Sequence, residues 1–597
     1  MKKILSFVFL PLLLAACINL DFVESDSLTS TALKSNPAAA VYTTDGIYAM
    51  MKDMATFRNG ISQNNTFIRQ YFLLNELKGD NICFSNTSTD PFWMAATYMD
   101  DANSANSAYM WVICYKLIYA ANANLSGLEE EEASDRQLKG ENYFLRAFFH
   151  FTLCNLFAKP YSFGKDNMGV VLRIGNDFTE TKRASLEECY NAIEADLLEA
   201  IRLMDPATKR GDNGYASKEA AQALLARLYL YKGEWQKCVE VCDELLGTDP
   251  ASHLEAEVTD LYSRVPSSKE VIWCVDITNT DLTNMPPKGN LASMYDSPDG
   301  TQGTGWGELY VADPLLDLMT RFPGDKRYTD LVRLHNSQPG LCINWGVLDD
   351  VNNCLTQAIA LPDVNKEAGT ISSSVTDNGD GTYSFTKDGK AYKAIPDNTA
   401  TKVSAEFPGY ILEGTKTRCY VRNVMPTPLI TATGSVIWTT TNTSIREGGY
   451  PTWFCEKFSH QTDLTFPISS SMIMLRYGEV VLNRAEAYAH LDNKEKALSD
   501  INVIRARAGL TGNAQMSAAN LASRGYPTVL DAVLDERRLE LYYEGFRVMD
   551  LLRNQRDIDR RFPSRTVCEV IPYTNPKIQY QIPIDETSVS GIPTNDR

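Results

Sequence analysis

The strongest periodicity of apolar residues lies between residues 472 and 553. Apolar positions recur there at helical spacing on both sides of a polar break at 491–493, as Leu475, Leu482, Ala485 and Tyr488 before it and Ala497, Ile501 and Ile504 after it. This pattern predicts two helices that form a hairpin, the second of which ends at Gly509. Thr528 and Asp531 have the spacing of a capping box and predict the start of a third helix.

The same hairpin pattern occurs earlier in the chain. The segment ALLARLYLYKGEWQKCVEVCDELL aligns on the later hairpin without gaps and matches Ala226 with Ala485, Tyr229 with Tyr488 and Lys237 with Lys496. A small residue, a tyrosine, a tight turn and an apolar position in the returning helix are typical of tetratricopeptide (TPR) hairpins. Such hairpins bury their apolar faces by stacking on neighbours. The two copies, 259 positions apart (485 − 226), therefore predict one helical scaffold with a long insertion.

The rest of the chain alternates between helical and irregular patterns. Ser185 and Glu188 predict another capped helix. Between about 250 and 470 the periodicity is short, with a strand predicted at 271–277 and strands joined by Asn-Gly and Asp-Gly turns at 376–395. We therefore predict a mainly α fold, a TPR-like scaffold with a large insertion of loops and short strands. Its segments are a signal peptide (1–16), a tether (17–44), an N-terminal helical part (45–250), the insertion (251–470) and a C-terminal TPR-like hairpin (471–597).

The N-terminus has the organisation of an export signal. Lys2 and Lys3 precede an apolar run from Ile4 to Leu14, and the sequence Leu-Ala-Ala-Cys ends at Cys17. The run is too short to span a bilayer and ends in small residues. It resembles a bacterial lipoprotein signal, which predicts a lipid on Cys17 that anchors the flexible tether to a membrane. The alternative is an ordinary secretory signal with an incidental cysteine.

Charge and motifs exclude several classes of function. The formal net charge of −18 argues against a nucleic-acid partner, because phosphates would be repelled. The five His are mostly far apart, His150 has the setting of a core residue, and no HExxH, GxSxG, Walker or dinucleotide motif occurs. In the stretch 377–381 a hairpin turn is favoured over a calcium loop, because Gly379 occupies the third position and no Glu closes the loop. We expect no enzyme, no cofactor and no metal site.

The charged residues of the C-terminal block are expected to be structural. Glu536, Arg537, Glu540, Glu544 and Arg547 crowd one predicted helix and its end. Spacings of three and four place opposite charges on one face. On an otherwise apolar scaffold such residues usually pair and hold helix against helix.

Several motifs together resemble one known family. The segments RYGEVVLNRAEAY and LDERRLELYYEGFRVMDLLR look like the C-terminal signature of the SusD/RagB family of Bacteroidetes outer-membrane lipoproteins. LKGDN at 77–81, the AN of AANANL at 121–125, the run AFFHFTLCNLFAKPY and LLDLMTRFPGDKR at 315–327 follow in the expected order. The resemblance implies four TPR-like hairpins and a nutrient-binding lid over a TonB-dependent (SusC-like) transporter, with no chemical step.

Two stretches combine loop aromatics with polar side chains, as a sugar site needs. Sugar rings pack their C–H faces on aromatic planes, while their hydroxyls require polar partners. The first stretch carries Trp93, Tyr98, Asp100 and Asn103, and the second carries Gln302, Trp306 and Tyr310. Both lie where the resembled family builds its ligand site. For each Trp the alternative is an anchor packed inward.

These features predict a lipid-anchored protein on the outside of the outer membrane. It would capture oligosaccharides and deliver them to a partner TonB-dependent transporter. Two alternatives remain open at this point. One is a RagB-like binder of oligopeptides with the same lid role, and the other is a TPR-like scaffold that holds a protein partner and no small ligand.

Overall fold

The computed structural model describes residues 39–595, except for 55, 58–59, 62–65, 85–89, 177–178, 285–290, 297–306, 336–339, 349–354, 362–363, 366–369, 372–375, 388–389, 397–408, 415–417, 425–427, 431–435, 439–451, 462–469, 562–566 and 568. Cys17 and the predicted signal and tether up to residue 38 lie outside the described residues. Residues 39–44, which we assigned to the tether, instead form the start of the helix Ala39–Lys52. No helix in the described part is long and apolar enough to cross a bilayer.

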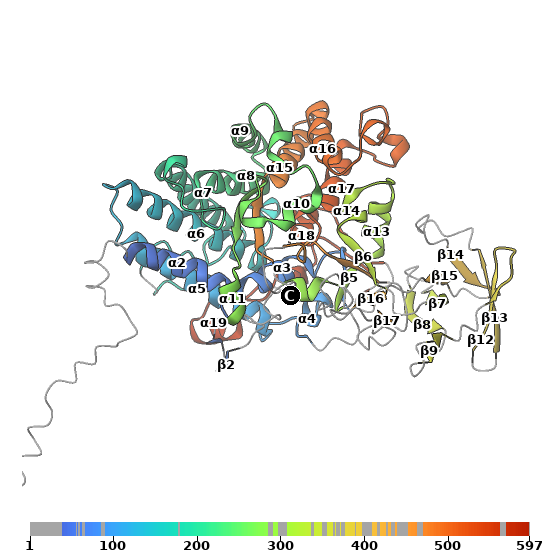
Figure 1. Ribbon diagram of the computed structural model, residues 1–597. Coiled ribbons are helices and arrows are strands. Elements are labelled where there is room, and N and C mark those ends of the chain that lie inside the picture. The colour runs from blue at the N-terminus through green and yellow to red at the C-terminus, as the bar shows by residue number, and fades with distance from the viewer. Residues whose placement is uncertain are drawn as a thin grey trace, which may run out of the picture.

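The described chain is mainly α, as predicted. Its helices include α2 (Ala39–Lys52), α3 (Phe67–Glu76), α4 (Trp93–Ala96), α5 (Ala105–Leu125), α6 (Ala133–Phe157), α7 (Leu186–Leu203), α8 (Lys218–Lys232), α9 (Trp235–Leu246), α10 (Val258–Ser263), α12 (Leu291–Tyr295), α13 (Asp313–Thr320), α14 (Lys326–Thr329), α15 (Tyr477–His490), α16 (Lys494–Arg507), α17 (Val529–Leu541), α18 (Arg547–Arg553) and α19 (Ile584–Val589). Figure 1 shows most of them gathered into one body that joins the N-terminal and C-terminal parts of the chain.

Both predicted capping boxes are present. Before α7 the backbone N–H of Ser185 donates to Glu188 at 2.8 Å, and the N–H of Glu188 donates to the Ser185 hydroxyl at 3.2 Å. Thr528 and Asp531 form the same reciprocal pair before α17. Each box satisfies two backbone donors that the helix itself leaves without partners, which fixes where the helix begins.

The two predicted hairpins form and pack on each other. The pairs α8–α9 and α15–α16 are the two copies, and α9 lies directly against α15. At this interface the Trp235 ring stacks on His490 with 3.9 Å between centroids. The buried side chains of Arg227 and Glu479 form an ion pair at 2.6 Å. The sequence repeat therefore marks two units of one stack, while the implied total of four hairpins stays a prediction.

The first residues of the C-terminal block correct one prediction. Residues 472–476, which we included in the first helix, form the strand β19 (Met472–Arg476), and α15 begins at Tyr477. β19 pairs antiparallel with β4 (Val271–Val275), the predicted strand at 271–277. A short apolar run fits a buried strand as well as a buried helix, so a distant partner strand decides its conformation.

The insertion contains more sheet than predicted. Seven strands form one antiparallel sheet with the spatial order β11 (Thr376–Asp377), β12 (Tyr383–Lys387), β13 (Lys390–Pro396), β14 (Gly409–Leu412), β15 (Arg418–Val424), β7 (Gly340–Leu348) and β8 (Leu355–Leu361). Figure 1 shows this sheet beside the helical body. The predicted turns are confirmed, because Gly379 and Gly381 adopt φ values of +74° and +80° between β11 and β12. The long-range pair β7–β15, which unites the strands, has no local signal.

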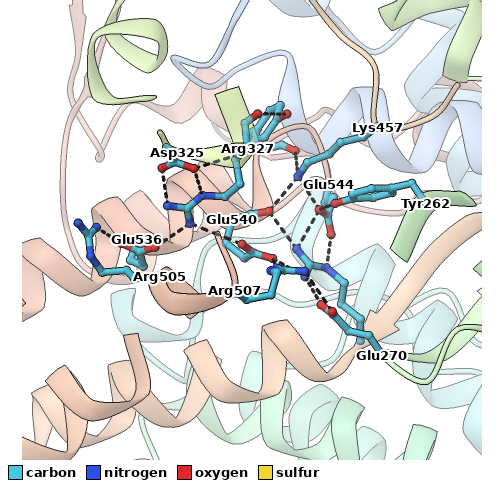
Figure 2. A network of polar contacts seen from close by, with 12 residues as sticks. Tyr262, Glu270, Asp325, Arg327, Lys457, Arg505, Arg507, Glu536, Glu540 and Glu544 are labelled. Carbon is cyan, nitrogen blue, oxygen red and sulfur yellow. Dashed lines mark hydrogen bonds and ion pairs between the residues drawn. The ribbon is translucent and has the colours of Figure 1, made fainter. Parts of the chain in front are cut away.

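The charged residues of the C-terminal block form a buried network that we call the ionic core. Figure 2 shows its members Tyr262, Glu270, Asp325, Arg327, Lys457, Arg505, Arg507, Glu536, Glu540 and Glu544, to which we add Arg476. Arg476 contacts Glu270 at 3.0 Å, Glu540 at 2.8 Å and Glu544 at 2.9 Å. Burial raises the pKa of Glu544, but Arg476 and Lys457 outweigh it and hold this pKa below its usual value. Outside this network Arg537 pairs with Asp550 at 3.0 Å and Arg547 pairs with Asp80 at 2.7 Å, so the predicted structural pairing is confirmed.

The insertion contributes cations to this core. Arg327 donates to Glu536 at 2.6 Å, and Lys457 donates to the Glu544 carboxylate at 2.7 Å. Lys457 also donates to the carbonyl oxygens of Glu540 and Tyr542 at 2.8 and 2.9 Å, at the C-terminal end of α17. A cation at this end of a helix satisfies carbonyls that lack helical partners. The insertion is thus bonded to the scaffold through charges as well as through the β4–β19 pair.

Candidate ligand-binding site

A short ladder brings the two predicted ligand stretches together. β3 (Ile82–Phe84) pairs antiparallel with β5 (Leu309–Val311), with Phe84 opposite Leu309. The chain that follows Phe84 and the chain that precedes Leu309 therefore leave the ladder at the same end. We call the described residues of these two segments, 90–104 and 307–308, the ligand edge. Residues from two distant parts of the chain thus border one region.

Tyr98 and Asp100 differ from our expectation, because both are buried at the base of the ligand edge. Tyr98 is 4% exposed and donates its hydroxyl to the carbonyl of Lys78, and Asp100 is 2% exposed and pairs with the Lys78 ammonium at 2.9 Å. Burial raises the pKa of Tyr98 to about 12 despite the nearby Arg560. Lys78 belongs to the LKGDN motif and lies 3.8 Å from the ring centre of Tyr580. These two side chains hold the loop to the scaffold.

Tyr310 is also buried rather than open to a ligand. It lies in β5, is 6% exposed and packs against Phe454 with 6.3 Å between ring centroids. Tyr310 lies opposite Cys83 in the ladder. Both residues belong to a small buried apolar cluster with Ala312 and Phe454. Loop aromatics cannot be told from strand residues when the partner strand is unknown.

Trp93 and Asn103 remain accessible. Trp93 is the first residue of α4 and is half-buried, with its ring edge-on to Phe84 at 6.1 Å. Asn103 is exposed, and its backbone N–H donates to Asp101 at 2.9 Å. Met99 lies between them in the sequence and is 66% exposed. The ligand edge therefore offers an aromatic ring, a flexible apolar side chain and amide and carboxylate groups within one short segment.

Two models of known protein families match this sequence. A family model described as the SusD family matches residues 269–591, more than half of the chain. The chain belongs to the SusD family. A second model, described as starch-binding associating with outer membrane, matches residues 45–230. The resemblance in the motifs is thereby confirmed.

Relatives and solved structures agree with this membership. The chain is 26% identical over 330 residues to a SusD-like protein P2 of Formosa agariphila, covering 53% of this chain and 61% of that one. It spans between about two fifths and three fifths of the length of the curated relatives it matches. A SusD superfamily protein from Bacteroides thetaiotaomicron has the same fold, with a TM-score of 0.62, 19% identity and coverage of 94% and 99% of the two chains. Surface glycan-binding protein A from Bacteroides uniformis gives a TM-score of 0.59, 15% identity and coverage of 94% and 99%.

Some predicted features of this SusD-family chain lie outside the described residues. Gln302 and Trp306 fall within 297–306, which the structure does not describe, so their role in binding stays a prediction. Within the described residues no cluster of three or more His, Cys, Asp or Glu is arranged to hold a metal ion.

His150 has the structural role that its Phe-rich helix predicted. It is buried in α6, and its Nδ1 lies 3.0 Å from the carbonyl of Arg146. Its Nε2 accepts the backbone N–H of Arg173 at 3.2 Å, which places the proton on Nδ1. Burial, together with Arg146, lowers the pKa of His150 to about 3, so the ring is neutral at physiological pH. Both nitrogens serve the fold.

Two residues that bond to each other at the ligand edge, Arg69 and Asp90, were not identified from the sequence. Arg69 is a lone cation on the apolar helix α3, and Asp90 precedes α4. The signal for Arg69 was its place in the run FIRQYFLL, because a buried charge usually has a bonded partner. Nothing in the sequence identified Asp90 as that partner.

Proposed function

We propose that this SusD-family chain is a surface lipoprotein that captures oligosaccharides and passes them to a TonB-dependent transporter in the outer membrane. Family membership supports outer-membrane association, because one matching model is described as starch-binding and associating with that membrane. A structural relative is described as a surface glycan-binding protein. No chemical step is needed for capture and transfer.

The single observation that carries the proposal is the β3–β5 ladder. It places the segments after Phe84 and before Leu309 at one end, so two stretches rich in aromatic and amide groups border one region. A sugar ring needs an apolar plane for its C–H face and polar groups for its hydroxyls. Trp93 supplies a plane that is partly open, and Asn103 supplies an exposed amide. Trp306 and Gln302 extend the same chemistry in the proposed site.

Lipidation of Cys17 completes the proposed arrangement. A lipid on Cys17 would anchor the chain through the segment between Cys17 and α2, and the helical body would then lie close to a transporter in the same membrane. The acidic surface expected from a net charge of −18 suits neutral ligands and disfavours polyanions. Neutral oligosaccharides are therefore the preferred ligand class.

Isothermal titration of the chain from residue 18 onward against soluble starch, xylan, mannan and mixed oligopeptides tests the proposal. Saturable heat with one of the glycans supports capture of oligosaccharides. Heat with peptides alone would replace the glycan proposal by the RagB-like alternative. Silence with every ligand, repeated with the purified transporter present, would contradict capture of either kind.

A further inference from the structure

Arg69 lies beneath the ligand edge and bonds to its first segment. It belongs to α3 and is fully buried. Its Nη2 donates to the Asp90 carboxylate, and its guanidinium carbon lies 4.6 Å from the ring centre of Phe92. Charge-assisted bonds of this kind are short and directional. Arg69 is thus attached to the residues that lead into α4.

Asp90 passes this restraint on to Trp93. Its other carboxylate oxygen accepts the backbone N–H of Phe92 at 3.0 Å, and its carbonyl accepts the N–H of Trp93 at 3.0 Å. These two bonds fix the turn that starts α4, so the direction of the Trp93 side chain depends on where Asp90 is held. Arg69 holds Asp90 from the core side.

The same guanidinium contacts the helix α12. Arg69 Nη2 lies 3.7 Å from the sulfur of Met294 in α12, the helix that directly precedes residues 297–306. The Glu308 carboxylate and the neighbouring Tyr295 also act on Arg69 electrostatically. Tyr295 is itself packed into the core against Tyr543, with 4.6 Å between ring centroids. Arg69 therefore lies between the first segment of the ligand edge and α12, and Glu308 of the second segment acts on it electrostatically.

We propose that Arg69 is a positioning residue, which sets the first segment of the ligand edge relative to α12 and thereby places Trp93 for ligand binding. The role of Arg69 in ligand binding rests on the proposed function, whereas its contacts with Asp90, Phe92 and Met294 do not. A planar, fully buried guanidinium can bond to Asp90 and contact Met294 and Phe92 at fixed angles, whereas a lysine ammonium is a point charge without that plane. Charge alone therefore does not replace it.

The first test measures amide hydrogen exchange in the ligand-free chain from residue 18 onward. In Arg69→Lys we expect peptides covering 91–97 and 291–296 to exchange together at least about tenfold faster than in the wild type, since both lose a common restraint. Arg69→Met should give the same pattern with a lower Tm. Faster exchange in only one of the two peptides, or in neither, would overturn the inference.

Arg505→Lys is the matched control. Arg505 is also fully buried, but it belongs to the ionic core. It pairs with the carboxylate of Glu536 at 2.7 Å and lies 4.3 Å from the ring centre of Phe322. Its replacement should lower the Tm and leave exchange at 91–97 and 291–296 unchanged. Equal acceleration of these peptides in the control would show general loosening and overturn the inference.

The second test separates positioning from stability by titration with soluble starch, or with whichever glycan of the panel binds the wild type. Arg69→Lys should recover much of the Tm lost in Arg69→Met, yet keep an affinity at least about tenfold below wild type. Affinity that recovers in step with the Tm would mean a merely structural role. If the wild type binds no glycan, the proposed function fails while the exchange test still decides the role of Arg69.

Discussion

In the ionic core Arg476 and Arg507 are each shared among several carboxylates, whereas at the ligand edge one guanidinium bonds to Asp90 and contacts α12. Arg476 alone contacts Glu270, Glu540 and Glu544, and Arg507 bonds to two of the same three carboxylates. The edge relies on a three-residue ladder, on the bond from Arg69 to Asp90 and on the contacts of Lys78 with Tyr98 and Asp100. Shared bonds hold the scaffold in one geometry, while a short ladder leaves the edge open to local opening. Stability and binding should therefore respond to different mutations.

The largest effect is expected when one cation is removed from the ionic core. Arg476→Met leaves three buried carboxylates without their shared partner and should lower the free energy of unfolding by about 3–5 kcal/mol, measured by urea denaturation. Arg202→Met is the control, because Arg202 pairs with Glu199 and Glu130 on the surface, where solvent screens the charges, and should change the free energy of unfolding far less. Similar losses in the two variants would contradict the special role of the core.

The next largest effect is a dependence of stability on pH that comes from Glu76. Glu76 is fully buried and accepts bonds from Asn81 at 2.8 Å and from the Gly545 N–H at 3.1 Å. Burial raises its pKa to about 7 against the effect of these bonds. The folded chain then binds more protons than the unfolded chain between pH 4.5 and 7. The contribution of Glu76 to stability is therefore greatest below this window and falls as the pH rises through it.

Replacing the carboxyl removes this dependence. When the pH rises from 5.5 to 8, the wild type should lose about 2 kcal/mol more unfolding free energy than Glu76→Gln loses. This whole range lies above the sequence pI of 4.9. Urea denaturation at both pH values measures the difference. The exposed Glu188 has a lowered pKa, set by bonds from Ser185, so Glu188→Gln should leave this slope unchanged. A wild-type slope that persists in Glu76→Gln would rule out Glu76 as its source.

Two tryptophans sharpen the contrast between stability and binding. Trp93→Ala should weaken glycan affinity about tenfold, or about 1.4 kcal/mol, with a small change in Tm, because the ring is partly open. Trp235→Ala should do the reverse, since that ring stacks on His490 between the two hairpins. Titration and thermal denaturation of both variants make the comparison. A large loss of Tm in Trp93→Ala would assign Trp93 to the core.

The smallest effect is expected at the exposed amide of the ligand edge. Asn103→Ala should lower glycan affinity by a factor of about three to ten, as expected for the loss of one hydrogen bond, and should leave the Tm unchanged. Asn378→Ala, at an exposed turn of the seven-stranded sheet, is the matched control and should bind like the wild type. Equal affinities in all three proteins would remove Asn103 from the site.

Local sequence signals predicted much of the scaffold, and distant contacts account for what they missed. The capping boxes at Ser185 and Thr528 and the hairpins α8–α9 and α15–α16 are encoded within a few turns of helix. The strand at 472–476 and the pair β7–β15 depend on partners far along the chain. At the site, the β3–β5 ladder joins the described residues next to the two stretches, while the role of both stretches in binding stays a prediction.

The orientation of individual site residues was beyond the sequence. Tyr98 and Asp100 look like ligand groups because they are polar and lie in a loop, yet Lys78 satisfies both of them. That lysine is twenty positions away from Tyr98, and no periodicity connects the two. Polar side chains at a loop base and at a loop tip have the same local pattern, so only the packed structure separates them.

The antiparallel pair β4–β19 gives the insertion a property of an exchangeable cassette. Val275 and Met472 are opposite each other in the ladder, so the insertion departs and returns at neighbouring points of the backbone. A foreign segment spliced there would have to replace the β3–β5 ladder and the contact of α13 with α17. It would also have to supply the positive charges that Arg327 and Lys457 bring to Glu536 and Glu544. A replacement segment without such positive charges would leave these buried carboxylates of the scaffold without those two partners.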